Sequence, residues 1–149
     1  MITLPKKCVY ALQAMFELAQ RNQTEPINAR KIAESQGIPL RFLETILNEL
    51  KQGGFVSAIR GNQGGFLLSK PASSITAGEI IDFLRKTDAA PGTEEKAAGM
   101  SLRPGDFAFE NLWSRLTNAI CEVLYKTTLT DLVEKEMRFQ AVYVGNYII

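Results

Sequence analysis

Histidine is absent from the 149-residue chain, and cysteine occurs only at Cys8 and Cys121. Without histidine the chain cannot form a Ser-His-Asp triad, a Cys-His pair or a histidine-ligated zinc site. Two cysteines so far apart in the sequence form neither a disulfide framework nor a cluster with the spacing of metal ligands. We therefore predict that the protein is not an enzyme and that it holds no metal or other cofactor.

Long apolar runs are also absent, so no segment is expected to span a membrane. The apolar stretch near the N-terminus is interrupted by Gln13, Glu17 and Gln20, which is not the pattern of a signal peptide. Apolar residues nevertheless make up 46% of the chain, enough to build a core. These features predict a cytoplasmic protein with unpaired cysteines.

Residues 28–52 have the pattern of two helices joined by a tight turn at Gly37. The first helix is expected over 28–36, and the second from Pro39 to about residue 52. In the second helix four leucines recur at helical spacing and predict one buried stripe: Leu40, Leu43, Leu47 and Leu50.

A glycine-tipped β-hairpin follows directly. Gly53 and Gly54 are expected to end the second helix, because glycine adopts the left-handed conformation found at helix C-termini. Strands are expected over 55–59 and 66–69, on either side of the glycine-rich tip 60–65. This order matches a winged helix–turn–helix, in which the second helix enters the DNA major groove and the hairpin contacts the backbone or the minor groove.

The second helix and the hairpin tip carry side chains of the types that contact DNA. Arginine reads guanine, asparagine reads adenine, glutamate accepts from cytosine, and the threonine methyl group contacts thymine. The candidate DNA contacts are Arg41, Phe42, Glu44, Thr45 and Asn48 of the helix, Arg60, Asn62, Gln63 and Gly64 of the hairpin, and Lys7 near the N-terminus. Because any surface helix carries polar residues, a helix that never touches DNA is the alternative.

Charge is unevenly divided, although the net charge of the chain is only +1. Residues 1–87 contain eleven Lys or Arg and seven Asp or Glu, a net charge of +4. Residues 88–149 contain six and nine, a net charge of −3. The positive half is the one with the helix–turn–helix, as attraction to phosphate requires.

The second half of the chain has a different pattern. Thr76 and Glu79 have the spacing of a capping box and predict the start of the last helix of the first domain. The expected fold is mostly helical with a small β-hairpin. Its parts are a winged helix–turn–helix domain over 1–87, a flexible loop over 88–106, a dimerisation helix over 107–138 and an apolar tail over 139–149.

The helix expected over 107–138 has an apolar stripe and no domain of its own to cover it. The stripe consists of Leu112, Trp113, Leu116, Ile120, Val123 and Leu124. A matching helix from a second copy is the expected cover, which makes the protein a homodimer. The alternative is that the helix folds back on its own domain.

With these motifs the chain resembles the Rrf2 family of bacterial transcription regulators over its first 87 residues. The resemblance is carried by Tyr10-Ala-Leu, Ile32-Ala-Glu, Gly37-Ile, Phe42-Leu-Glu, Gly54-Phe-Val, Arg60-Gly, Gly64-Gly-Phe and Ile75-Thr-Ala-Gly-Glu-Ile-Ile. It implies a homodimer whose long C-terminal helices cross between subunits. It also implies DNA contacts at the start of the second helix and at Arg60 on the wing.

The best-known members of that family hold an iron–sulfur cluster through three closely spaced cysteines in the loop before the long helix. Residues 88–106 contain no cysteine, and the chain has no histidine to serve as a fourth ligand. We therefore expect a cluster-free member, with packing roles for Cys8 and Cys121. The cluster-free branch includes regulators of cysteine and sulfur metabolism, which Leu112-Trp113 and residues 127–132 resemble.

The apolar tail includes Tyr147, Ile148 and Ile149. One interpretation is a final strand or turn packed on the dimer. The other follows from a resemblance, because cysteine-metabolism regulators of this family also end in isoleucine. Such tails enter the active site of cysteine synthase, where a terminal carboxylate takes the place of the substrate's carboxylate.

The function expected from the sequence is that of a dimeric regulator, most simply a repressor of sulfur or cysteine genes, that binds a palindromic site in double-stranded DNA. The alternative is a protein-interaction module that uses the winged helix and the tail to bind a partner protein.

Overall fold

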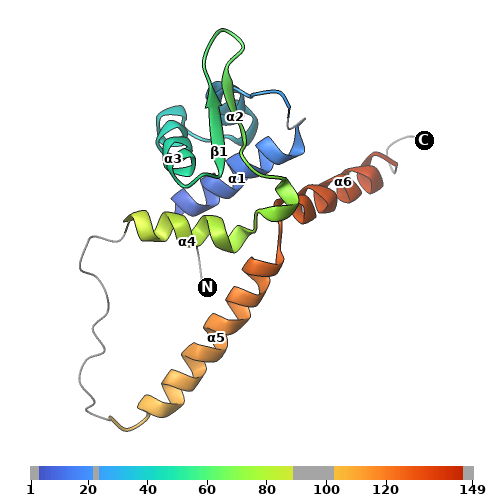
Figure 1. The fold of residues 1–149 in the computed structure, drawn as a ribbon. Coiled ribbons are helices and arrows are strands. Elements are labelled where there is room, and N and C mark those ends of the chain that lie inside the picture. The colour runs from blue at the N-terminus through green and yellow to red at the C-terminus, as the bar shows by residue number, and fades with distance from the viewer. Residues whose placement is uncertain (1–3, 22–23, 89–102, 146–149) are drawn as a thin grey trace.

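The structure, a computed structural model, describes residues 4–21, 24–88 and 103–145 (Figure 1). Its elements are α1 (Lys6–Gln20), α2 (Ala29–Gln36), α3 (Leu40–Gln52), β1 (Val56–Ile59), β2 (Gly65–Leu68), the 3₁₀ turn η1 (Ala72–Ser74), α4 (Ala77–Asp88), α5 (Asp106–Lys126) and α6 (Leu129–Gly145). A mostly helical fold with one antiparallel hairpin confirms the predicted class.

Helices α1, α3 and α4 pack around one core. Leu43, Leu47 and Leu50 of the predicted leucine stripe are fully buried, while Leu40 in the first turn of α3 is half-buried. The other large, fully buried side chains of this half are Met15, Ile32, Ile46, Val56, Ile75, Ile80, Ile81 and Leu84. The core thus draws on every helix from α1 to α4, so these helices form one domain.

The residues at the two ends of α2 determine where the first helix of the helix–turn–helix begins and ends. The Oδ1 of Asn28 accepts a hydrogen bond from the backbone N–H of Lys31 at 2.9 Å and caps the first turn. At the other end Gly37 has φ +65°, a left-handed conformation that glycine adopts without steric cost. The chain therefore turns sharply before α3, as the sequence predicted.

The hairpin is joined to the helix–turn–helix through Ile27. In the hairpin Val56 lies opposite Leu68, and Ile59 lies opposite Gly65. The N–H of Ile27 donates to the carbonyl of Phe66 at 2.9 Å, and the N–H of Phe66 donates back at 2.8 Å. Because Ile27 directly precedes the capping residue of α2, the base of the hairpin and α2 are held together.

The helix predicted over 107–138 is two helices, because residues 127–128 leave helical geometry. Thr128 forms an isolated antiparallel bridge with Thr76, and Leu129 is fully buried in the core. The prediction of one continuous helix was therefore wrong. Burial of Leu129 and the backbone bridge hold this part of the chain at the domain. Helix α6 therefore begins there and runs in a different direction from α5.

Both helices that begin at this bridge have the same cap. The N–H of Thr76 donates to the Glu79 carboxylate at 2.9 Å and the Thr76 hydroxyl accepts from the N–H of Glu79 at 3.3 Å, which confirms the predicted capping box. Thr128 and Asp131 repeat the arrangement at 2.8 and 3.1 Å. The second box is the sequence signal for the start of α6.

Helix α6 continues to Gly145, so residues 139–145 are helical and do not form the strand or turn expected there. Tyr147, Ile148 and Ile149 lie outside the described residues. So do residues 89–102 of the predicted loop.

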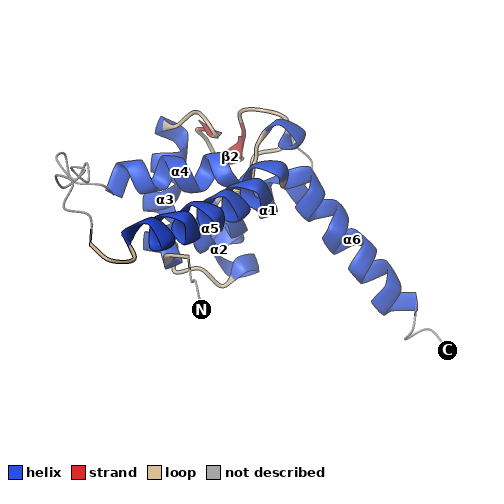
Figure 2. Cartoon of the chain, turned by 90° about the horizontal axis from the view of Figure 1, so that it is seen from below, coloured by secondary structure: helices blue, strands red, loops and turns tan. Residues whose placement is uncertain are grey.

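The last two helices point away from the domain. Helix α5 descends from it, and α6 extends to the side, as Figure 1 and the view from below in Figure 2 show. The C-terminal end of α5 is seated by Tyr125, whose hydroxyl donates to Asp82 and whose ring would meet a Cβ on Gly78 at 2.8 Å. None of the described helices is both long and apolar enough to cross a membrane.

A buried carboxylate joins α1 to α2. Glu17 is only 3% exposed. Its Oε1 accepts from the Nε of Arg21 at 2.7 Å, and its Oε2 accepts from the Ser35 hydroxyl at 2.9 Å and from the Gln36 amide at 2.8 Å. Burial raises the pKa of this carboxyl, but the hydrogen bonds from Gln36, Arg21 and Ser35 outweigh it and hold the pKa below its ordinary value of 4.5.

Replacing Glu17 with Gln is expected to destabilise the fold at neutral pH by about 1–3 kcal/mol, because a buried network of charge-assisted hydrogen bonds loses its acceptor. The pKa of Glu17 is lower in the folded than in the unfolded chain, so its contribution is complete above about pH 4.5 and is lost as the pH falls through the folded pKa. Urea denaturation at a series of pH values measures this.

The difference in unfolding free energy between wild type and Glu17→Gln should therefore be largest at neutral pH and shrink in acid. Glu34→Gln, at an exposed position of α2, should match wild type throughout. A difference that stays constant with pH would contradict the assignment.

Candidate nucleic-acid interface

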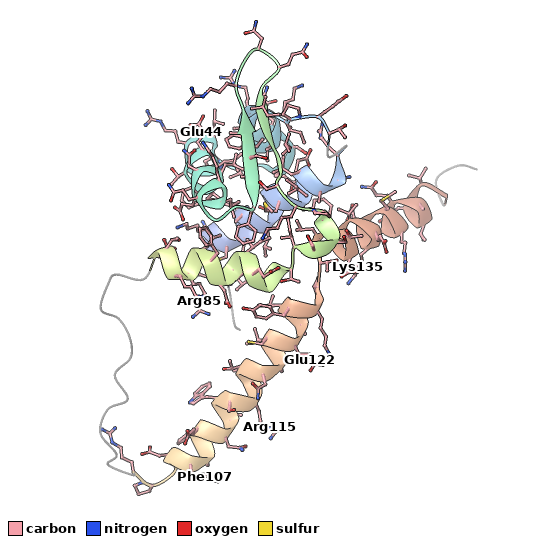
Figure 3. The ribbon with its side chains drawn as sticks, in the orientation of Figure 1. Glu44, Arg85, Phe107, Arg115, Glu122 and Lys135 are labelled. Carbon is pink, nitrogen blue, oxygen red and sulfur yellow. The ribbon has the colours of Figure 1, made fainter. Side chains whose placement is uncertain are left out.

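The face of α3 opposite the buried leucines carries the predicted reading residues. Arg41, Glu44, Thr45 and Asn48 are all exposed there, and Figure 3 labels Glu44 on this helix. Within the described residues neither Arg41 nor Glu44 forms an ion pair. Both charges are therefore available to an external ligand.

Phe42 has a mixed environment. Its ring is 38% exposed and meets the ring of Tyr10 in α1 edge to face, with centroids 5.6 Å apart. Such pairs contribute about 0.5–1.5 kcal/mol beyond the buried area. Phe42 thus anchors the start of α3 on α1 while part of its ring stays accessible beside Arg41.

The tip of the wing is a tight turn with its side chains exposed. Arg60, Asn62 and Gln63 are exposed, and the N–H of Gly64 donates to the carbonyl of Gly61 at 3.0 Å. Gly61 has φ +116°, which only glycine adopts readily. A Cβ on Gly64 would collide with the carbonyl oxygen of Ile59, so the turn could not close with another residue there.

Close packing at the base explains the second glycine of the Gly64-Gly65 pair. A Cβ on Gly65 would collide with the backbone of Ile27, the residue that bonds the hairpin to the start of α2. Glycine at this position therefore lets the wing lie directly against the helix–turn–helix. The geometry ties the position of Arg60 and the tip to that of α2.

Lys31 belongs to this surface, although the sequence reasoning did not select it. A polar cleft of about 440 Å³ separates the start of α2 from the wing tip and is lined by Asn28, Lys31, Asn62, Gln63 and Gly64 among others. An exposed cation in the first turn of a helix suits phosphate, because the helix N-terminus carries a partial positive charge. Its sequence signal was a lysine three residues after the capping Asn28.

Lys7, the remaining candidate DNA contact, lies away from the wing and the outer face of α3. Its ammonium forms ion pairs with Glu49 of α3 at 2.7 Å and Asp88 of α4 at 2.5 Å, and its side chain is only 15% exposed. Burial lowers the pKa of Lys7, but these two carboxylates outweigh it and the pKa is raised. The structure thus places Lys7 between three helices and does not bring it together with the wing and the outer face of α3.

The predicted dimerisation stripe lies open along α5. Leu112, Trp113 and Val123 are 51%, 59% and 65% exposed, and no residue of α5 is buried. Leu116 and Ile120 are half-buried, and Leu124 packs partly against the core near the junction with α6. Figure 3 shows the helix running outward from Glu122 to Phe107 with its side chains uncovered.

These features define a winged helix–turn–helix protein with an exposed polar face on α3 and an uncovered apolar stripe on α5. A model of the Rrf2 family, described as an iron-dependent transcriptional regulator, matches residues 4–135. The chain therefore belongs to the Rrf2 family of transcription regulators, as its sequence indicated. It is a DNA-binding regulator, and its relatives are not enzymes.

Two transcription regulators, IscR and CymR, are similar to this chain over most of their length. The HTH-type transcriptional regulator IscR of Klebsiella pneumoniae (strain 342) is 35% identical over 134 residues, which cover 89% of this chain and 80% of that protein. Among solved structures, IscR of T. potens has a TM-score of 0.75 at 30% identity, covering 91% of this chain and 88% of that one. CymR, the global cysteine regulator of B. subtilis, has a TM-score of 0.73 at 32% identity, covering 91% and 98%.

The residues of this chain do not fit the iron–sulfur cluster of the best-known members. Such clusters are held mainly by cysteine thiolates. Cys8 is buried in the core, where burial and then the nearby Asp88 raise the pKa of its thiol and disfavour the thiolate. Cys121 is exposed on α5, far along the chain, so the packing role predicted for it is not found within a single chain.

Proposed function

We propose that the protein binds a palindromic operator as a dimer, with α3 of each subunit in a major groove and the wing along the adjacent backbone. The observation that carries the proposal is the shared exposure of Arg41 and Glu44 on α3 and of Arg60 on the wing, which Ile27 bonds to the start of α2. In this geometry the wing follows the position of the reading helix. Half-sites should lie about one helical turn apart, or a multiple of it.

The proposal gives the charged residues different roles. Arg41 and Glu44, at the start of α3, are placed to meet guanine and cytosine edges in the major groove. Arg60 and Lys31 contact phosphates or the minor groove, which gives affinity with little sequence preference. Lys7 is left out of this interface because Glu49 and Asp88 neutralise it.

Replacing Arg60 with Ala is expected to weaken binding to all DNA sequences and to lower the salt dependence by about one counterion. Replacing Glu44 with Ala should instead relax preference at one base pair, a change of about 1–3 kcal/mol in discrimination. Mobility shift with the protein's own promoter and a scrambled duplex measures both.

Glu34→Ala, at an exposed position on α2 outside the proposed contacts, serves as the control and should behave as wild type. Equal affinity of the wild type for the promoter and the scrambled duplex in moderate salt would contradict sequence-specific binding.

The dimer in this proposal forms through α5. An exposed stripe that includes Trp113 and Val123 leaves far more apolar surface in water than scattered surface residues do. An antiparallel or crossing helix from a second copy covers such a stripe and places two reading helices on one duplex. The small hollow formed by Ala119, Ile120, Val123 and Leu124 offers a place for a side chain of that copy.

A charge in the centre of the stripe should separate the subunits. Ile120→Glu is expected to convert the dimer to a monomer and to lower operator affinity strongly, since burying an unpaired carboxylate is unfavourable. Asn118→Glu, on the opposite side of the same turn, should leave the dimer intact. Sedimentation equilibrium measures the oligomeric state of both variants. A dimeric Ile120→Glu protein would mean that the interface lies elsewhere.

We propose that the protein regulates genes of sulfur or cysteine metabolism and that it represses their transcription. The support is the similarity to CymR, which covers 98% of that chain, together with the missing cluster ligands. The contact between residues 147–149 and cysteine synthase belongs to the same proposal and rests on the family resemblance alone.

Genome-wide binding in the native host tests this assignment. Peaks are expected upstream of genes for cysteine synthesis and sulfur uptake, and their transcripts should rise when the gene is deleted. Peaks confined to iron–sulfur assembly genes would favour the IscR-like alternative, and falling transcripts would make the protein an activator.

A further inference from the structure

Helix α5 meets the domain at its C-terminal end. Figure 1 shows this end beside α4 and the rest of the helix running away from the domain. Among the described residues, one side-chain hydrogen bond joins α5 to the domain, and the Tyr125 hydroxyl donates it to the Asp82 carboxylate of α4. Leu124 adds an apolar contact with the core. The direction of a helix of 21 residues is thus set within its last turn.

The backbone just after α5 fixes a point and not a direction. The N–H of Ala77 donates to the carbonyl of Thr127 at 2.9 Å, and the N–H of Leu129 donates to the carbonyl of Ile75 at 3.0 Å. These bonds hold residues 127–129 at the start of α4. Thr127 has extended backbone geometry, with φ −97° and ψ 110°, in a broad allowed region that leaves the direction of α5 open. A second contact, away from this point, is needed to fix the direction.

Tyr125 provides that contact, and a glycine makes room for its ring. A Cβ on Gly78, in the first turn of α4, would lie 2.8 Å from the Cγ and Cδ2 atoms of the ring. The ring would have to turn, or α5 would have to tilt. Alanine is the better helix former, so the ring that lies on this position explains the glycine. Tyr125 with Gly78 and Asp82 is called the Tyr125 contact below.

The hydroxyl makes the contact directional. Apolar packing of the ring and of Leu124 is non-directional, whereas a hydrogen bond prefers a narrow range of angles. The hydrogen bond to Asp82 raises the pKa of Tyr125 above its ordinary value of 10. The phenol is therefore protonated, and donates, at neutral pH.

The length of α5 amplifies any change at this contact. At a rise of about 1.5 Å per residue, Trp113 of the apolar stripe lies about 18 Å along α5 from Tyr125. A tilt of about 10° at the contact moves Trp113 by about 3 Å, close to the rise of about 3.4 Å per base pair of DNA. In a symmetric dimer both subunits make the same shift. In a dimer joined through α5, the tilt therefore changes the distance between the two copies of α3.

We propose that the Tyr125 contact is a positioning element that fixes the angle of α5 to the domain and thereby sets the spacing of half-sites that the protein accepts. The second part rests on the proposed function, while the first does not.

Distances between spin labels measure the angle of α5 without DNA. Glu34→Cys on α2 and Ser114→Cys on α5 introduce labelling sites at exposed positions, in a Cys121→Ser background that leaves only the buried Cys8. Diluting labelled with unlabelled protein restricts the measurement to distances within one chain. Double electron–electron resonance should show a single narrow distance when the Tyr125 contact is intact.

Variants of the contact should change that distance. Tyr125→Phe loses the hydrogen bond and should broaden the distribution, and Gly78→Ala displaces the ring and should shift its mean by up to about 3 Å. Asp82→Asn keeps an acceptor oxygen and should retain the wild-type distribution. Tyr143→Phe, the same exchange at an exposed position of α6, is the control and should also match wild type. Unchanged distributions in both Tyr125→Phe and Gly78→Ala would overturn the proposal.

Duplexes with different half-site spacings measure the effect on DNA recognition. Footprinting on the protein's own promoter defines the operator, which is then prepared with its natural spacing, with one base pair inserted, and as a single half-site. The insertion should lower wild-type affinity at least about tenfold in mobility shift. Tyr125→Phe should reduce this ratio to about threefold or less and leave half-site affinity unchanged, because no DNA contact is altered.

An unchanged spacing ratio in Tyr125→Phe and Gly78→Ala, or a loss of half-site affinity along with the ratio, would overturn the role in spacing. If the wild type binds no promoter DNA, or binds a single half-site as tightly as the whole operator, the proposed function fails. The label distances still decide in that case whether the Tyr125 contact fixes the angle of α5.

Discussion

The hydrogen bonds to the buried Glu17 carboxylate are the contact on which the DNA-binding half depends. Helix α2 has eight residues, too few to be stable alone. Its apolar contacts hold it to the core, but hydrophobic burial is non-directional and leaves rotation and sliding open. The directed bonds from Ser35 and Gln36 fix α2 on α1, and α3 follows because only the turn at Gly37 and Ile38-Pro39 separates the two helices.

A second constraint fixes the positions of α5 and α6 relative to the domain. The bridge between Thr76 and Thr128 joins the start of α4 to the start of α6. Because Leu129 is buried there, α5 arrives at the domain and α6 leaves it at one fixed point. Most side chains of α5 consequently face solvent, while Leu124 and Tyr125 near its C-terminal end contact the domain. The same junction brings α6 against α1 and thereby creates a groove that contains Gln13.

Residues 88–106 lack the ligands that an iron–sulfur cluster needs. Iron–sulfur clusters are held mainly by cysteine thiolates. This chain has no cysteine there, and the thiol of Cys8 is kept protonated in the core. The groove between α1 and α6 lies beside the helix–turn–helix, and Gln36 of α2 is one of its lining residues.

The winged helix–turn–helix was readable from the sequence because its determinants are local. Leucine spacing predicts the buried face of α3, Gly37 and the glycine-rich tip predict the turns, and Thr76 with Glu79 predicts a helix start. Exposed positions on α3 follow from the same periodicity, so Arg41, Glu44 and Asn48 were placed correctly on its outer face.

Tertiary structure alone decided the features that join distant segments. Lys7 was predicted to contact DNA, yet its ammonium lies between Glu49 and Asp88, the latter 81 residues away in the chain. The break between α5 and α6 has a local signal in Thr128 and Asp131, but only the folded core shows that Leu129 is buried there. Helical periodicity predicts which face of a helix is apolar. The ion-pair partner of a charged side chain and the burial of a particular leucine depend on residues that come close only when the chain folds.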